Sequence, residues 1–390
     1  MVINMSEYNN VPKIRFKGYT DAWEQRKLTS FVEFYNGQTY SPLNVQDRGV
    51  LVLRSSNVQN GEISKDDLVF IDSDVVNTNN VEIGDIIVVV RNGSRNLIGK
   101  HAQIKEKMTD TVIGAFMTGI RSKNPEFVNS LLNTRIFDDE INKNMGATIN
   151  QITGYMFSNM EFKIPTSDEQ SKIGELFTNL DNLITLHQRK CDALMNVKKS
   201  LLEKMFPKNS SNIPEIRFKG FTDVWEQRKL ENIFNYERPD KYIVSSTEYL
   251  EFGPTPVLTA NKAFILGYTT EKNKYVNSKE SIIFDDFTLD TKFVDFPYMV
   301  KSSAIKILTL KDVTKDNIRF NFELLSNHKF NMLGHARHYI SVVQPEEVFT
   351  PNKQEQDKIG ELFTNLDNLI TLHQHKELKR RNDNNEHLRW

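Results

Sequence analysis

The stretch KIGELFTNLDNLITLHQ at residues 172–188 returns unchanged at residues 358–374. A second stretch, PKIRFKGYTDAWEQRKL at residues 12–28, returns as PEIRFKGFTDVWEQRKL at residues 214–230. We call the stretch at residues 12–28 and 214–230 the opening motif, and the stretch at residues 172–188 and 358–374 the closing motif. Each half of the chain begins with the opening motif and ends with the closing motif. Internal repeats fix the organisation of a chain, and these indicate two half-units in tandem.

Between the motifs the similarity disappears. Residues 29–168 and 231–353 share almost nothing and differ in length. A solenoid repeats its whole unit, because each unit packs on the next. Repeated motifs that enclose two different regions, which we call the repeated frame, favour two different domains that are held in the same way. The alternative is an old duplication whose middle regions drifted apart.

The closing motif begins a predicted helix over residues 168–205. Ser167 or Asp168 can cap it, and Glu169 suits a helix N-terminus. Pro207 and the polar KNSSN that follows end it. Apolar residues recur at helical spacing along one side, which is typical of a helix that packs along another helix. In the first copy they are Ile173, Leu176, Phe177, Leu180, Leu183, Ile184, Leu194 and Leu201.

The second copy starts in the same way and then changes character. Its apolar stripe comprises Ile359, Leu362, Phe363, Leu366, Leu369 and Ile370. Beyond it the stripe positions are polar or charged, and HKELKRRNDNNEHLRW at residues 375–390 reads as a polar tail in which we expect the helix to fray.

The regions between the motifs predict mixed α+β domains. Short β-branched runs bounded by turn formers indicate strands at residues 51–56, 85–90, 280–286 and 304–308. Helical segments are expected at residues 125–133 and 320–333. We therefore divide the chain into a first domain at 1–167, a helix and linker at 168–207, a second domain at 208–353, and a shortened second helix at 354–390.

Composition narrows the class of protein. The chain has 390 residues and a formal net charge of -1, so any binding of nucleic acid needs locally arranged basic residues or basic partners. Cys191 is the only cysteine, which excludes an intramolecular disulfide. The first residues lack the apolar core of a secretory signal, and no apolar run is long enough to span a bilayer. We expect a cytoplasmic protein.

Catalytic motifs are not found in the sequence. There is no Pro-Pro dipeptide for the base-holding loop of an adenine methyltransferase, and no Gly-x-Gly cofactor loop. GSRNLIGKH at residues 93–101 misses the P-loop spacing and ends in His101 instead of Ser or Thr. Close histidine pairs lack the further ligands of a zinc site, and Asp285 with Asp286 is better read as a turn at a strand end. We predict a non-catalytic chain without metal or cofactor of its own.

The two motifs resemble those of the specificity subunits of type I restriction-modification systems. IRFKGYTDAWEQRKL and IRFKGFTDVWEQRKL are similar to the start of target-recognition domains in that family. EQSKIGELFTNLDNLITLHQRK and EQDKIGELFTNLDNLITLHQHK resemble its conserved helical regions, and the likeness covers the chain from about residue 11. The polar ending departs from the family, whose second helix keeps its apolar stripe to a hydrophobic end.

The resemblance implies a fold and an assembly. The fold would be two globular target-recognition domains separated by two long antiparallel coiled-coil-like helices, with pseudo-two-fold symmetry. The target would be double-stranded DNA with two specific halves and an unspecific spacer. The partners would be two modification (methyltransferase) subunits and two ATP-driven restriction subunits, which would carry S-adenosylmethionine, ATP and Mg²⁺.

Residues that read bases must be polar and lie in loops at strand ends. In the first domain these are Arg54, Ser55, Ser56 and Asn57, then Arg91, Asn92, Ser94 and Arg95, then Thr148, Asn150 and Gln151. In the second domain they are Thr259, Asn261 and Lys262, and then His335, Arg337, His338 and Tyr339. We align the last loop, GHARHYI at 334–340, with GATINQI at 146–152. Each of these loops could also be an ordinary solvated turn, whereas Trp23 and Trp225 in the opening motifs are expected to be packing residues.

Two other functions compete with DNA recognition. A scaffold whose domains bind proteins would suit the near-zero net charge. A self-contained restriction enzyme is disfavoured, because the sequence lacks the motifs that it would need.

Independence of the two halves is testable by exchange. Replacing residues 29–168 with the matching region of another member of the resembled family should change one half of the methylated motif only. Long-read sequencing of DNA from cells carrying the chimera would show this. A change in both halves would contradict the modular interpretation.

Overall fold

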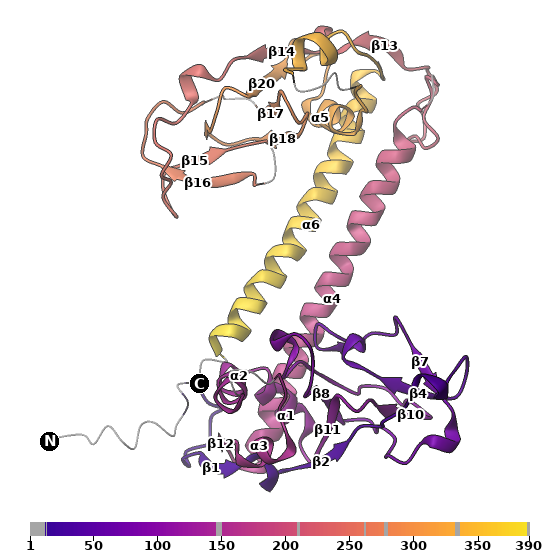
Figure 1. Cartoon of the computed structure of the whole chain (residues 1–390). Coiled ribbons are helices and arrows are strands. Elements are labelled where there is room, and N and C mark those ends of the chain that lie inside the picture. The colour runs from indigo at the N-terminus through magenta and orange to yellow at the C-terminus, as the bar shows by residue number, and fades with distance from the viewer. Residues whose placement is uncertain are drawn as a thin grey trace, which may run out of the picture. The chain divides into compact units, whose positions relative to one another are not determined.

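The computed structural model describes residues 12, 14–145, 150–208, 211–260, 263–276, 280–331 and 336–387, the last thirteen of them by backbone alone. The chain forms two compact units. Unit 1 comprises Met1–His187 with Lys376–Trp390, and unit 2 comprises Gln188–His375. Both contain strands and helices, as the α+β prediction requires (Figure 1).

Unit 1 is built around two four-stranded sheets. The antiparallel sheet has the order β2-β11-β8-β9, with strands Val32–Asn36, Met117–Ser122, Ile86–Val89 and His101–Gln103. The mixed sheet has the order β10-β4-β7-β3, with strands Thr111–Ile113, Val50–Leu53, Val69–Ile71 and Val45–Gln46. Two small pairs complete the unit: β1 (Glu24–Lys27) with β12 (Glu161–Ile164), and β5 (Val58–Gln59) with β6 (Glu62–Ile63).

Helices close one side of the antiparallel sheet of unit 1. They are α1 (Pro125–Leu132), α2 (Arg135–Asn144), α3 (Gly154–Asn159) and the beginning of α4 (Ser167–Met205). The main core lies between these helices and β8 and β11, and includes Trp23, Ile86, Ile120, Phe137 and Phe162.

Unit 2 repeats the central part of this plan. Its antiparallel sheet has the order β14-β20-β17-β18, with strands Phe234–Glu237, Ile305–Leu310, Ser281–Asp285 and Thr291–Val294. A three-stranded sheet has the order β16-β15-β19, with strands Ile265–Thr269, Thr255–Leu258 and Met299–Val300. The pair β13 (Glu226–Lys229) with β21 (Glu347–Thr350), helix α5 (Ile318–Asn327) and the π-helix Tyr339–Val343 complete its globular part.

Within unit 2 the second half of α4 lies antiparallel to the first half of α6 (Lys353–His387), as Figure 1 shows. Lys198 Nζ is 2.7 Å from Asp367 Oδ1 in the middle of this pair. Met205, the last residue of α4, and Phe206, which follows it, share a core with Ile359 and Phe363 near the start of α6. The two long helices therefore pack together, as predicted. None of the helices in the described part of the chain is long and apolar enough to cross a membrane.

The opening and closing motifs contact each other in each half of the chain. Arg15 donates from Nε and Nη2 to Glu169 Oε1 and Oε2, both at 2.7 Å, and Glu169 is fully buried. Arg217 donates to Glu355 in the same fork at 2.8 and 2.7 Å, and Glu355 is also fully buried. A two-pronged guanidinium–carboxylate contact fixes direction as well as distance. The charge of Glu169 is expected to suit the helix N-terminus. Through Arg15 it also fixes the beginning of the domain on α4.

Further contacts of the motifs are repeated. Gln25 donates to Glu161 and Gln227 donates to Glu347 across the two-stranded pairs. A Cβ added at Gly174 would lie 2.6 Å from the backbone nitrogen of Phe127, so this glycine allows α1 to approach α4 closely. Trp23 and Trp225 are buried in the two cores, which confirms their packing role.

The strand predictions agree with the structure. The expected strands at 85–90, 280–286 and 304–308 correspond to β8, β17 and β20, and the one expected at 51–56 is the shorter β4, which ends at Leu53 before the 3-10 turn Ser55–Asn57. The helix expected at 125–133 is α1. The helix expected at 320–333 is the shorter and earlier α5, because Asn317 caps it by accepting a hydrogen bond from the backbone nitrogen of Phe320.

The expected fraying of the second helix is wrong, because α6 continues to His387. Residues 375–387 contain no proline or glycine and include several lysines, arginines and glutamates, which have high helix propensity even without an apolar stripe.

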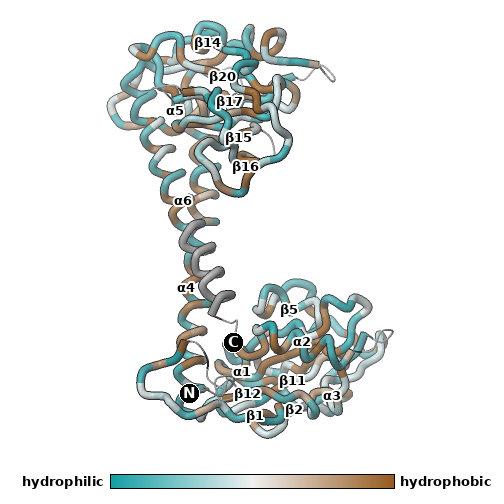
Figure 2. Tube along the Cα trace, turned by 90° about the vertical axis from the view of Figure 1, so that its left-hand side faces the viewer, coloured by the Kyte–Doolittle hydropathy of each residue, from teal (hydrophilic) through white to brown (hydrophobic). Residues whose placement is uncertain are grey.

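The apolar residues of α4 pack on the globular cores as well as on the other long helix. Ile173 and Phe177 lie in the core of unit 1, with Leu180 packed against that core. In unit 2 the core includes Ile359, Phe363 and Leu366, with Leu194, Leu201 and Leu362 packed against it. Leu176, Leu183 and Leu369 are exposed, and Ile184 and Ile370 are half-buried. Figure 2 shows apolar and polar residues alternating along both helices. Helical periodicity predicts which side is buried, but not whether a sheet or another helix covers it.

The two Arg–Glu forks should be among the most sensitive ion pairs of the described residues. Replacing Glu169 by Gln leaves a buried guanidinium without its counter-charge, so unit 1 should lose roughly 3 kcal/mol of stability. Glu355→Gln should do the same in unit 2. Hydrogen exchange measured by mass spectrometry should show faster exchange only in the unit that carries the change.

Arg26→Gln is the matched control, because the pair of Arg26 with Glu24 is exposed and should contribute little. Equal losses for Glu169→Gln and Arg26→Gln would contradict the role assigned to the buried pair.

Candidate nucleic-acid interface

Three polar loops of unit 1 meet at the end of β8. The backbone of Arg91 pairs with that of Gln151 in an isolated antiparallel bridge. Asn150 donates from Nδ2 to the carbonyl of Gly93 at 3.1 Å, and Asn92 donates from Nδ2 to Ser55 Oγ at 3.2 Å. The three groups of candidates in this domain, which lie far apart in sequence, therefore form one surface.

Arg91 is exposed and lies against an aromatic ring. Its guanidinium carbon is 5.2 Å from the centre of the Phe116 ring, and Phe116 is itself 52% exposed. The cation–π interaction of an arginine with an exposed phenylalanine ring is worth about 0.5–1 kcal/mol, and it leaves the N–H donors of the guanidinium free to bind a ligand. Phe116 is not among the residues predicted from the sequence. The available signal was a large aromatic residue in the Gly114–Met117 turn between two strands.

A groove of about 800 Å³ adjoins this surface. Arg54, Ser55 and Ser56 line it together with Phe116 and Tyr40. Arg54 donates to Asp67 Oδ2 at 2.7 Å, so this cation is directed by an acidic neighbour. Ser94 is exposed and Arg95 half-buried in the following turn, and Thr148 lies outside the described residues.

Asn57 is not available to a ligand, which corrects its assignment. Its side chain is fully buried, accepts a hydrogen bond from the backbone of Arg54 and donates to the carbonyls of Ser64 and Asp66. A buried amide that satisfies this many backbone groups holds a loop in shape. Asn57 therefore positions the loop that carries Arg54.

Among the described candidates of unit 2, Arg337 is the exposed cation. Its guanidinium carbon lies 5.8 Å from the centre of the Phe287 ring, and Nη2 is 3.3 Å from Ser303 Oγ. Phe287 is 44% exposed. Each unit thus carries an exposed arginine on an exposed phenylalanine near the end of its central strand.

His338 and Tyr339 are buried, so the structure overturns their assignment as direct contacts. The backbone nitrogen of His338 donates to the carbonyl of Asp286 at 2.9 Å, and that of Tyr339 donates to Asp286 Oδ1 at 2.8 Å. Asp286 is in turn paired with buried Lys306 at 2.9 Å. Burial raises the pKa of the Tyr339 hydroxyl, which keeps it neutral. These residues anchor the loop that presents Arg337.

The other candidates of unit 2 are either buried or outside the described residues. Thr259 is buried, and its backbone nitrogen donates to the carbonyl of Phe264 at 3.1 Å. Asn261, Lys262 and His335 lie outside the described residues. In the part of the chain that the structure describes, no three His, Cys, Asp or Glu side chains are grouped as metal ligands.

Backbone hydrogen bonds fix how the loops of the two units correspond. Ile152 donates to the carbonyl of Val90 at 2.8 Å, as His338 donates to that of Asp286. Val90 donates to the carbonyl of Phe116, as Asp286 donates to that of Ala304. His338 therefore takes the place of Ile152, and the loop alignment by glycine and isoleucine is wrong by two residues.

With this register, the pair Arg91 and Gln151 of unit 1 corresponds to Phe287 and Arg337 of unit 2. Both units place two large side chains at the same point beyond the central strand. One of the two is an arginine in each case, but it comes from the strand end in unit 1 and from the later loop in unit 2. The same location therefore presents different chemistry in the two halves.

Comparison with known proteins identifies relatives. The family described as "Type I restriction modification DNA specificity domain" matches residues 20–196 and 222–380. The chain is 37% identical over 133 residues to the "Type I restriction enzyme EcoR124I/EcoR124II specificity subunit" of Escherichia coli, an alignment covering 33% of each protein. It is 27% identical over 173 residues to the StySPI specificity subunit of Salmonella potsdam, covering 42% of this chain and 36% of that protein. The matched parts thus span about a third of these relatives.

The fold also matches a solved structure. The type I restriction-modification system S subunit from M. genitalium superposes with a TM-score of 0.68 over 97% of both chains, at 15% sequence identity. At this identity the likeness concerns the fold.

The buried loop anchors predict a stability effect. Asn57→Ala leaves the backbone groups of Arg54, Ser64 and Asp66 without partners, and should lower the free energy of unfolding by about 1–3 kcal/mol. Urea unfolding followed by circular dichroism would measure this. Ser56→Ala in the same turn is the control, because Ser56 is exposed. An unchanged urea midpoint for Asn57→Ala would mean that the Asn57 side chain does not stabilise the loop, and Asn57 would again be a candidate for DNA contact.

Proposed function

Because this chain belongs to the family of type I restriction modification DNA specificity domains, we propose that it reads a split DNA target, one half with each domain. Residues 1–167 and 208–353 would be the two target-recognition domains, and the helices at 168–207 and 354–390 would hold them. The chain acts as the non-catalytic specificity subunit of a methyltransferase and endonuclease complex.

The observation that carries this proposal is the different chemistry that the two units present at one location. Arg91 and Gln151 of unit 1 match Phe287 and Arg337 of unit 2, so the exposed arginine comes from the strand end in one unit and from the later loop in the other. Arginine is the side chain that most often reads a base edge in the major groove, through two parallel donors. A scaffold that bound the same protein twice would need the same chemistry in both places, whereas a reader of two different half-sites needs different chemistry.

Partners would supply what this chain does not carry. Two modification subunits would bring S-adenosylmethionine and the methylating chemistry, and two restriction subunits would bring ATP, Mg²⁺ and cleavage. The net charge of -1 supports this division, because contacts to many phosphates need more positive charge than this chain carries overall. The specificity subunit would then place the methyltransferases on the two halves of the target.

The experiment is to express the chain with its modification subunits and map methylated adenines by long-read sequencing. A single motif of two specific halves with a fixed spacer is the expected result. Methylation without a split motif, or none that depends on this chain, would favour the scaffold.

Individual arginines give a sharper prediction. Arg91→Ala should weaken binding to the specific target by roughly 1–3 kcal/mol and relax one base position in one half of the motif. Arg337→Ala should relax one position in the other half. Fluorescence anisotropy with single-base variants of the target, using the complex with modification subunits, would measure both.

Arg135→Ala is the control, because this exposed arginine lies on α2 and pairs only loosely with Asp139 at 4.0 Å. Equal weakening on all sequences, with a smaller salt dependence, would mean that Arg91 holds a phosphate.

A further inference from the structure

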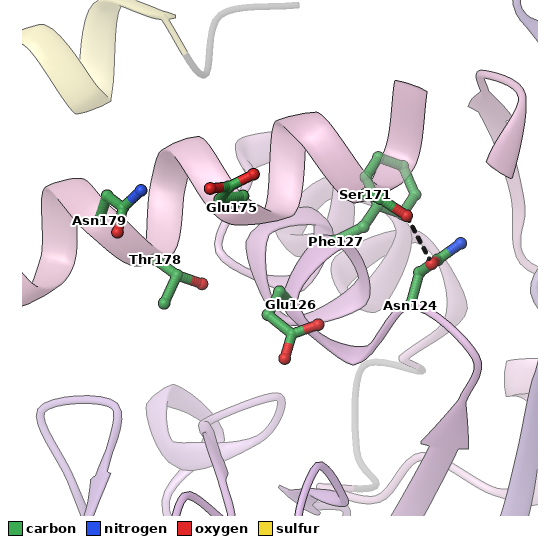
Figure 3. A pocket seen from close by; sticks show the side chains of 7 residues that line it. All are labelled: Asn124, Glu126, Phe127, Ser171, Glu175, Thr178 and Asn179. Atoms are coloured by element: carbon green, nitrogen blue, oxygen red, sulfur yellow. Dashed lines mark hydrogen bonds between the residues drawn. The ribbon is translucent and has the colours of Figure 1, made fainter. Parts of the chain in front are cut away.

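A second concave site lies in unit 1, between the start of α1 and the closing motif on α4 (Figure 3). The cavity has a volume of about 290 Å³. Its lining includes the carboxylates of Glu126 and Glu175, the hydroxyl of Thr178 and the amide of Asn179. Glu126 and Glu175 are exposed, and Thr178 is half-buried. This set of groups presents several hydrogen-bond acceptors and a double negative charge.

The same helical sequence holds a guanidinium in unit 2. Arg319 of α5 donates from Nε to Thr364 Oγ1 at 3.0 Å and from Nη2 to Asp367 Oδ2 at 2.9 Å. Thr364 stands in the repeat where Thr178 stands in unit 1. Lys198 adds a second cation, with Nζ 2.7 Å from Asp367 Oδ1 and 3.0 Å from Glu323 Oε1. This surface of the closing motif therefore binds cationic side chains in the copy where they are available.

The correspondence of the two sites is fixed by contacts to the long helices. Asn124 precedes α1 and donates to Gln170 Oε1 at 3.0 Å, while the backbone of Asn317, which precedes α5, donates to Gln356 Oε1 at 2.9 Å. Gln170 and Gln356 each lie two residues before the start of the repeated stretch. Counting from the asparagines, Glu126 occupies the place of Arg319. A carboxylate thus replaces the guanidinium, and the acceptors of the helix face a cavity.

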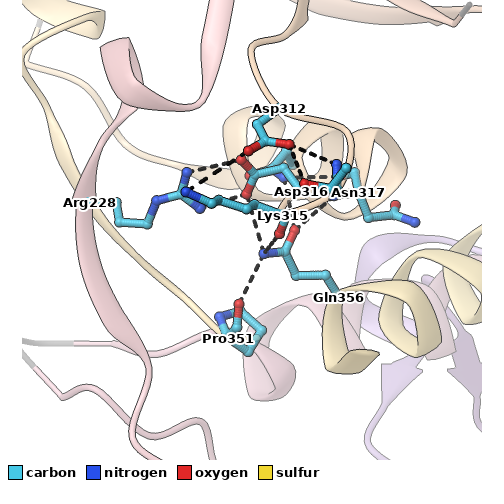
Figure 4. A network of polar contacts seen from close by, with 9 residues as sticks. Arg228, Asp312, Lys315, Asp316, Asn317, Pro351 and Gln356 are labelled. Carbon is cyan, nitrogen blue, oxygen red and sulfur yellow. Dashed lines mark hydrogen bonds and ion pairs between the residues drawn. The ribbon is translucent and has the colours of Figure 1, made fainter. Parts of the chain in front are cut away.

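The neighbouring position is inverted as well. In unit 2, Arg228 donates to both oxygens of Asp316, at 2.6 and 2.9 Å, within the network of Figure 4. Lys123 precedes Asn124 in unit 1, where unit 2 has Asp316. Arg26, the counterpart of Arg228, turns to Glu24 instead. Unit 1 therefore lacks the charges of Arg319 and Asp316 at these two positions, while Asp181, the counterpart of Asp367, interacts with Lys105.

We propose that the cavity between α1 and α4 is a binding site for an arginine or lysine side chain supplied from outside the globular part of unit 1. The guanidinium would take the place that Arg319 fills in unit 2, hydrogen-bonded to Thr178 and paired with Glu126 and Glu175. Two sources share this chemistry: a partner protein of the complex, and the basic KELKRR segment of this chain at residues 376–381.

The first test transplants the cation of unit 2 into unit 1. In the full chain, Glu126→Arg should raise the melting temperature by about 2–4 °C relative to Glu126→Gln, which removes the charge without adding a guanidinium. Thr178→Val in the Glu126→Arg background should remove most of that gain. Equal melting temperatures for Glu126→Arg and Glu126→Gln would overturn the proposal.

The second test uses a small probe, N-acetyl-arginine methylamide, with the full chain labelled with ¹⁵N threonine. The Thr178 amide resonance should shift saturably at millimolar probe, and Glu126→Arg should abolish the shift. A shift that does not saturate, or that persists in Glu126→Arg, would count against a site.

The two sources are separated by changing Lys376, Lys379, Arg380 and Arg381 together to Ser. Tighter binding of the probe after this change identifies the chain's own segment as the occupant. Unchanged binding, together with loss of modification-subunit binding in Glu126→Arg, identifies the partner. Both results require the site; failure of the probe to bind either form refutes it. None of these measurements depends on DNA recognition, so they can fail while the proposed function stands.

Discussion

The buried fork between an arginine of the opening motif and a glutamate of the closing motif is the contact on which each half of the chain depends. A carboxylate with no exposed surface is stable only when its charge is met and its oxygens are hydrogen-bonded. Arg15 and Arg217 meet both requirements, at 2.7–2.8 Å. The fork ties the first residues of a domain to the helix that follows its last strand. Everything between these points can then vary, provided that its ends return to the same place.

This constraint explains why the contents of the two frames can differ while their geometry agrees. In both units the central strand ends beside a loop whose backbone donates to it, and the position beyond carries two large side chains. The backbone contacts are the shared part, and the side chains that they present are free to change. Different chemistry at one fixed location is what a pair of recognition domains with a common support requires.

The sequence predicted the frame and the strands well, because repeats and β-branched runs are local signals. It predicted the interface less well. Asn57, His338 and Tyr339 are polar residues in loops, as base-reading residues must be, but the pattern does not reveal that they point inward to satisfy backbone groups or pack beneath the loop. Phe116 and Phe287 were missed for the opposite reason, since exposed aromatic residues resemble core residues in sequence. The two-residue error in aligning the loops arose because a glycine and an isoleucine carry less information than the hydrogen bonds that define the register.

Helix α4 also limits which motifs can find each other while the chain folds. The two copies are so alike that Arg217 could serve Glu169 as well as it serves Glu355, and it is nearer to Glu169 in sequence. Once helical, the stretch from Glu169 to Met205 is about 54 Å long, at about 1.5 Å per residue. The connection from Met205 to Arg217 reaches at most about 43 Å even when fully extended. Because the helix is longer than the extended connection, Arg217 could approach Glu169 only with the connection and both side chains almost fully extended, so each arginine pairs far more readily with the glutamate of its own half.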